Sequence, residues 1–127
     1  MSTQASPALP HGWHTVTPRI VARDARRLVA FLADVFGADG AFEAERPSIV
    51  RIGDSLLMIS EADIRPPAPA FLHVYVDDVD ATFRRAVEAG VRVVEEPFAT
   101  PYGDRRCMFE DDWGNRWQAA VAASDAA

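Results

Sequence analysis

The chain has 127 residues, of which 49% are hydrophobic and 25% are charged, and its formal net charge is −6. These values predict one globular domain with a full hydrophobic core, since a chain of this length buries roughly two-thirds of its unfolded surface. The acidic balance and the absence of lysine disfavour a nucleic-acid partner, and no apolar run is long enough to cross a bilayer, so we expect no membrane partner.

The two ends of the chain, residues 1–13 and 122–127, have little periodicity, which indicates flexible segments. The N-terminus lacks both the basic start and the apolar stretch of a secretory signal. Cys107 is the only cysteine, which excludes an internal disulfide. We therefore expect a cytoplasmic protein.

The first half of the chain reads as a strand, a helix and three short strands. VTPRIVA (16–22) predicts the first strand, and Asp24 and Gly37 are placed to begin and end a helix with one apolar stripe. The following segments 41–45, 48–53 and 55–60 predict strands, and Gly53-Asp54 predicts a tight hairpin between the last two.

The second half repeats this order after a proline-rich connector, RPPAPA (65–70). Strand 71–76 is followed by Asp77 or Asp78 as a cap, a helix that ends at Gly90, and strands at 91–96, 105–111 and 115–121. We therefore predict an α+β fold of two βαβββ modules, residues 14–62 and 71–121, joined by a linker at 63–70. The modules should form a curved mixed sheet around a cavity, with the helices outside.

The strand FLHVYV (71–76) alternates aliphatic residues with Phe71, His73 and Tyr75. Successive side chains of a strand point to opposite faces, so the aliphatic set should pack on the helices. The other set should face the cavity, where it could be core, the lining of a ligand site or the start of a metal site.

Four segments together resemble the vicinal oxygen chelate superfamily, the group of glyoxalases, bleomycin-resistance proteins and extradiol dioxygenases, and most closely its PhnB-like members. They are VTPRIVARD with FLADVFGA, IGDSLLMIS, LHVYVDDVDATFRRAVEAG and PYGDRRCMFEDDWGNRW. The resemblance covers about residues 14–121 and implies the two-module fold and a homodimer.

Metal-dependent members of this superfamily hold a divalent ion with a His on the first strand and a carboxylate on the last strand of each module. By that resemblance the ligand positions fall on Thr17, Phe71, Leu57 or Met58, and Gln118. These side chains are poor ligands for a divalent ion, so we expect no metal and no other cofactor. His73 lies two residues beyond Phe71 on the same strand face and could be a hydrogen-bonded wall residue, a ligand-recognition group or, least favoured, a metal ligand.

The predicted cavity is lined by aromatic and polar side chains that suit a small planar organic molecule. The candidate lining residues are Thr17, Arg19, Met58, Phe71, His73, Tyr75, Arg116, and either Trp117 or Gln118, depending on the register of the last strand. The segment PYGDRR (101–106) adds Tyr102, Asp104 and Arg105 as candidates for the rim of the cavity. A purely structural turn, with a local pairing of Asp104 and Arg105, explains the same segment.

These features favour a protein that binds a small molecule by sequestration, as antibiotic-binding members of the superfamily do. The alternative is a lyase, isomerase or dioxygenase, either metal-dependent or with His73 as a general acid or base together with Tyr75 or Asp104. A third class is a structural or regulatory module. No nucleophile with an adjacent base is visible in the sequence.

Overall fold

The structure is a computed structural model that describes residues 8–123. Much of the two segments predicted to be flexible therefore lies outside the described residues. The elements, in chain order, are β1 (Arg19–Ala22), α1 (Ala25–Phe36), β2 (Ser48–Ile52), β3 (Ser55–Glu61), β4 (Phe71–Tyr75), α2 (Val79–Glu88), β5 (Arg92–Ala99), β6 (Arg105–Glu110) and β7 (Arg116–Val121).

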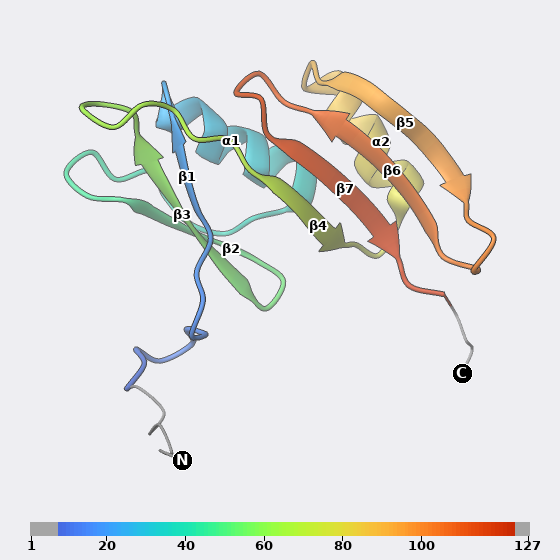
Figure 1. Ribbon diagram of the computed structural model, residues 1–127, viewed down its shortest axis with the longest axis horizontal. Coiled ribbons are helices and arrows are strands. Elements are labelled where there is room, and N and C mark those ends of the chain that lie inside the picture. The colour runs from blue at the N-terminus through green and yellow to red at the C-terminus, as the bar shows by residue number, and fades with distance from the viewer. Residues whose placement is uncertain (1–7, 124–127) are drawn as a thin grey trace, which may run out of the picture.

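The strands form two mixed sheets with the helices on one side of them (Figure 1). Sheet one has the strand order β1-β3-β2, and sheet two has the order β4-β7-β6-β5. In each sheet the first strand of the module runs parallel to its last strand, and the other neighbours are antiparallel. The predicted α+β class with two modules is confirmed, but the strands form two separate sheets rather than one curved sheet, and they do not close into a barrel.

The strand predicted at residues 41–45 does not form, and this prediction was wrong. A single bridge between Asp39 and Arg51 replaces it, with N–H···O distances of 2.9 and 2.7 Å. Gly40 follows at φ 136°, where a Cβ atom would lie 2.3 Å from the Ile49 carbonyl oxygen. The chain therefore touches the backbone of β2 at one point and does not run alongside it, and the first module has one strand fewer than the second.

Both helices begin at predicted caps, α1 ends at the predicted Gly37, and α2 ends at Glu88, shortly before the predicted Gly90. Asp24 caps α1 by accepting a hydrogen bond from Arg27 N, and Gly37 ends the helix in the left-handed conformation at φ 67°. Asp78, rather than Asp77, caps α2 by accepting from Ala81 N. Glu61, at the end of β3, also accepts hydrogen bonds from Asp24 N and Ala25 N, both at 2.9 Å, so it ties the sheet to the start of α1.

One hydrophobic core connects the two modules. Phe36 of α1 packs against two aromatic side chains of sheet two, with ring centroids 6.1 Å from Phe109 and 5.2 Å from Trp117. The core takes its buried residues from the helix-facing sides of both sheets and from both helices. Within residues 8–123 no helix is both long and apolar enough to span a membrane.

Candidate functional site

The face of sheet two that points away from the helices carries the predicted site residues of β4. Leu72 and Val74 pack against the core, as the alternation of the strand predicts, and Phe71, His73 and Tyr75 point to the other side. On this open face Phe71 is 62% exposed and Tyr75 is 70% exposed. Exposed aromatic side chains that gather on one face of a sheet are typical of a binding or interaction surface.

The strand register places three rows of side chains across the open face. The first row is Phe71, Arg116, Glu110 and Arg92; the second is His73, Gln118, Met108 and Glu95; the third is Tyr75, Ala120, Arg106 and Phe98. This register resolves the open alternative for β7, because Gln118 lies beside His73 on the open face. Trp117 lies on the opposite face, where it is fully buried.

His73 is held by its two neighbours on this face. Its Nδ1 atom lies 2.7 Å from Gln118 Oε1, and its ring meets the Tyr75 ring edge to face at a centroid distance of 4.9 Å. Because an amide oxygen only accepts hydrogen bonds, Nδ1–H is the donor to Gln118, and in the neutral ring the lone pair is then on Nε2. His73 therefore presents a positioned nitrogen that can accept a hydrogen bond or a proton.

The side chains at the ligand positions of metal-dependent relatives do not fit a divalent ion. In the middle row, His73 is paired with the neutral amide of Gln118, where such an ion would need a carboxylate. Thr17 precedes β1, and Met58 lies opposite Arg19 in sheet one. Among the described residues, His, Cys, Asp and Glu form no group of three that could hold a metal.

A cleft of about 250 Å³ adjoins His73 between sheet two and the β2–β3 hairpin. Its lining comes from β4, from the hairpin and from the segment before β1: Pro18, Ile52, Gly53, Asp54, Ser55, Leu57, Leu72, His73, Val74, Tyr75 and the buried Trp117. The sequence predicts the Gly53-Asp54 turn but not its position beside β4. That position depends on how the modules pack, which no local pattern encodes.

Arg19 and Met58, two candidates from the first module, lie apart from this cleft. Arg19 and Met58 face each other on β1 and β3, and Arg19 Nε donates to Ser60 Oγ at 2.9 Å. Met58 lines a different hollow, of about 490 Å³, together with Trp13 and Ile49. Within one chain the structure thus groups Phe71, His73, Tyr75 and Gln118 on sheet two, and Arg19 and Met58 on sheet one.

The PYGDRR segment forms a structural turn between β5 and β6. The Thr100 hydroxyl donates to the Asp104 carboxylate, and Thr100 N donates to Asp104 O at 2.8 Å. Arg105 points to the helix side, where its Nε and Nη2 atoms bind the two carboxylate oxygens of Asp80 at 2.9 Å each. The Arg105 guanidinium thus joins β6 to α2, and Asp104 caps the turn. Tyr102 is 76% exposed at the tip of the turn.

The Arg105–Asp80 pair shifts both ionisable groups toward their charged forms. The hydrogen bonds from Arg105 lower the pKa of the Asp80 carboxyl below its usual value, and the same contacts raise the pKa of Arg105. Glu110, in the first row of the open face, likewise has a lowered pKa because Arg92 and Arg116 donate to it.

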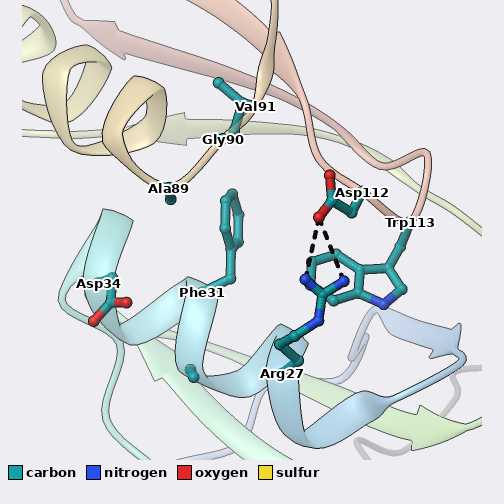
Figure 2. Close-up of a pocket in the computed structure, with 9 residues that line it drawn as sticks. Arg27, Phe31, Asp34, Ala89, Gly90, Val91, Asp112 and Trp113 are labelled. Carbon is teal, nitrogen blue, oxygen red and sulfur yellow. Dashed lines mark hydrogen bonds and ion pairs between the residues drawn. The ribbon is translucent and has the colours of Figure 1, made fainter.

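The DDWGNRW segment joins the modules on the helix side. Asp112 Oδ2 accepts from Arg27 Nη1 and Nη2 at 3.2 and 3.3 Å, and the Arg27 guanidinium lies 4.7 Å from the centroid of the Trp113 ring. Figure 2 shows these side chains around a small hollow of about 170 Å³ between α1 and the end of α2. Phe31 of α1 also lines this hollow and points toward the end of α2. Trp113 Nε1 also donates to Arg23 O at 2.7 Å, which makes this segment a structural contact.

Comparison with known proteins places the chain in a family. The solved structures of similar fold include TioX from Micromonospora sp. ML1, with 23% identity, a TM-score of 0.70 and coverage of 83% of this chain and 95% of that one. They also include the fosfomycin resistance protein FosX from Mesorhizobium loti, with 21% identity, a TM-score of 0.66 and coverage of 87% and 92%. At these identities the likeness shows the fold.

A curated relative, an uncharacterised protein of Mycobacterium bovis, is 41% identical over 49 residues, which are 39% of this chain and 32% of the relative. The match thus spans about a third of that protein's length. The model of the glyoxalase/bleomycin resistance protein/dioxygenase superfamily matches residues 13–119. With the two-module fold, this match shows that the chain belongs to the glyoxalase/bleomycin resistance protein/dioxygenase superfamily.

Proposed function

We propose that this protein binds a small planar organic molecule on the open face of sheet two, without a metal ion, and that it acts by sequestration or resistance. The observation that carries the proposal is the pair of exposed aromatic rings, Phe71 and Tyr75, on either side of the His73–Gln118 hydrogen bond. Rings of a ligand stack on such side chains with about 0.5–1.5 kcal/mol per pair beyond burial. The fosfomycin resistance protein of the same fold is consistent with this kind of role.

We further propose that two copies of the chain form a homodimer in the cytoplasm and that the second copy covers the open face. A ligand site buries most of its ligand, and the cleft beside His73 is open in one chain. A second copy would provide the missing wall. Sedimentation at increasing protein concentration tests this, with a species of twice the mass of one chain as the expected result.

The binding proposal is tested by a thermal-shift screen of planar antibiotics and metabolites, followed by titration of the hits. A ligand at 100 times its dissociation constant adds about 2.7 kcal/mol of stability to a protein that binds it only when folded. Tyr75→Ala should weaken the binding of the hits about tenfold, which corresponds to about 1.4 kcal/mol. Tyr102→Ala removes a comparably exposed tyrosine from the β5–β6 turn and is the matched control.

Stoichiometric divalent metal in protein purified without chelator would contradict the metal-free part of this proposal. Hits whose affinity is the same in Tyr75→Ala and Tyr102→Ala would contradict the placement of the ligand.

An enzyme of the same superfamily is the second candidate, favoured by the free Nε2 of His73. A general base needs a positioned lone pair within reach of the substrate, and the Gln118 bond fixes the ring for that purpose. Incubation of each hit with the protein and analysis of the products separates the candidates. Product formation that stops in His73→Ala supports the enzyme, and unchanged ligand recovered from the complex supports the binding protein.

A further inference from the structure

Two charged residues of the open face, Glu95 in the second row and Arg106 in the third, form an ion pair without a hydrogen bond. Arg106 on β6 and Glu95 on β5 lie on the same face, with 3.8 Å between Nε and Oε1. Both atoms are buried, and neither has a hydrogen-bond partner within residues 8–123. A buried donor and a buried acceptor without partners are costly, so such a pair calls for a reason.

The other charges of the open face are satisfied, which makes this pair distinct. Glu110 accepts from Arg92 Nη2 at 2.7 Å and from Arg116 Nε at 3.2 Å. Both of those arginines are thus engaged. Arg106 instead lies with its guanidinium 5.2 Å from the centroid of the Phe98 ring, a cation–π contact.

The outer ends of the two side chains remain accessible, since Arg106 is 29% exposed and Glu95 is 36% exposed. A hydrogen-bonded ion pair would have to separate before a ligand could bind between its two groups. Arg106 Nε and Glu95 Oε1 form no hydrogen bond, so a ligand can bind them without that loss. The guanidinium offers a row of donors, and the carboxylate beside it offers acceptors. The complementary ligand group is one that carries an acceptor next to a donor, as a carboxamide or a lactam does.

The charges decide between a neutral and an anionic ligand. Arg106 attracts a carboxylate, but Glu95 at 3.8 Å from it repels the same group, so the net gain for an anion is small. An amide gains both contacts, because its C=O accepts from Arg106 and its N–H donates to Glu95. Neighbouring strands are about 4.8 Å apart, so Arg106 on β6 is about 10 Å from β4, close to the length of a two- or three-ring planar molecule.

We propose that Arg106 and Glu95 form a subsite for the amide edge of a neutral planar ligand whose rings lie toward His73 and Tyr75. This inference rests on the proposed function, because it assigns a ligand class to the same open face. It selects carboxamides and lactams over carboxylates of the same shape.

The test uses two probes of equal shape, 2-naphthamide and 2-naphthoate, with the full chain at neutral pH. Dissociation constants are obtained from chemical-shift changes in two-dimensional NMR titrations. The variants are Arg106→Gln, Glu95→Gln and, as a matched control on the same face, Arg92→Gln. The spectrum of each variant without probe verifies that it is folded.

We expect the amide to bind about tenfold more tightly than the acid in the unmodified chain. Glu95→Gln removes the repulsion, so the preference should fall to about threefold or less. Arg106→Gln should weaken the amide about tenfold, and Arg92→Gln should change neither affinity by more than about twofold. These three results together support the subsite.

Equal binding of the two probes, tighter binding of 2-naphthoate, or an unchanged amide affinity in Arg106→Gln overturns the subsite. If such binding still shifts the His73 and Gln118 signals and is lost in Tyr75→Ala, the proposed function stands without the subsite. If neither probe binds at millimolar concentration, the subsite is overturned. The proposed function is then tested separately by the thermal-shift screen of planar antibiotics and metabolites. If Arg106→Gln lowers the sedimenting mass and leaves the affinities unchanged, the pair is a contact between copies and the subsite is also overturned.

Discussion

The Asp111 carboxylate accepts four hydrogen bonds at the turn between β6 and β7. Its Oδ1 accepts from Trp113 N and Asn115 N at 2.9 Å each, and its Oδ2 accepts from Asn115 Nδ2 at 2.9 Å and Trp117 Nε1 at 2.8 Å. Asn115 in turn accepts from Ala70 N at 2.8 Å, which connects the turn to the start of β4. The sequence predicts the turn from Gly114 but not this network, because the four donors reach one acceptor only in the folded chain.

Removal of the Asp111 carboxylate should therefore be costly. In Asp111→Ala the donors of Asn115 and Trp117 lose their acceptor inside the protein, and the free energy of unfolding should fall by about 3 kcal/mol. Asp112→Ala is the matched control, since its side chain is 54% exposed and its ion pair with Arg27 should contribute less than about 1 kcal/mol. Urea unfolding measures both values, and equal losses in the two variants would contradict the role of the network.

Cys107 is fully buried on the helix side of β6, and burial raises the pKa of its thiol to about 11. Since the thiolate is the reactive form, Cys107 should not react with Ellman's reagent at pH 8 in the folded protein. It should react with one equivalent in concentrated guanidinium. Tyr102→Cys provides an exposed thiol as the control, which should react at once, and rapid reaction of Cys107 in the folded chain would contradict the burial of its side chain.

At the scale of elements, the ion pair between Arg105 and Asp80 fixes β6 to the first turn of α2. The sequence predicts both elements because their caps, turns and alternations are local. It does not identify the pair, since Asp80 and Arg105 belong to different elements 25 residues apart. The strand predicted at 41–45 fails for the same kind of reason. AFEAE alternates like a strand, but a strand needs a partner along its length, and Gly40 allows only one point of contact with β2.

The pH dependence of this pair follows from the lowered pKa of Asp80. A carboxyl whose pKa is lower in the folded state stabilises the fold above its unfolded pKa, and this contribution disappears as the pH falls through the folded pKa. The free energy of unfolding of Asp80→Asn should therefore be lower than that of the unmodified chain at pH 7. This difference should shrink below pH 3.8, the usual pKa of an aspartate side chain.

Urea unfolding at a series of pH values measures this difference for the Asp80 variant. In the background of Arg105→Gln the Asp80→Asn substitution should have a smaller effect at pH 7, because its partner is gone. If the difference in free energy of unfolding between the unmodified chain and Asp80→Asn stays constant down to pH 3, the pH dependence does not come from the Arg105–Asp80 pair.

At the scale of the whole molecule, the two sheets share one core through α1 and the ring of Phe36. We therefore expect the modules to unfold together, so that tryptophan fluorescence and far-ultraviolet circular dichroism follow the same urea transition. Phe36→Ala should lower the free energy of unfolding by about 3 kcal/mol. The exposed Phe71 provides the control, since Phe71→Ala should cost less than about 1 kcal/mol.

Two separated transitions would show instead that the modules are independent units.

The open face shows most clearly what a sequence leaves undetermined. The alternation of residues 71–75 predicts which side chains leave the core, and the resemblance to the superfamily predicts the fold that presents them. Neither predicts that Phe71 and Tyr75 stay accessible in a single chain, that the β2–β3 hairpin lies beside His73, or that Arg106 and Glu95 stop short of a hydrogen bond. These facts depend on distances between elements.

The segment between the modules is held to its own chain by hydrogen bonds near its C-terminal end. Ala68 pairs with Val21 of β1, with an N–H···O distance of 2.9 Å from Ala68 N to Val21 O, and Arg116 N donates to Ala70 O at 2.9 Å. Three prolines further limit its extension. Such a connector is poorly suited to reach across to a neighbouring chain, so the two copies of a dimer should each keep both of their own halves, without domain swapping.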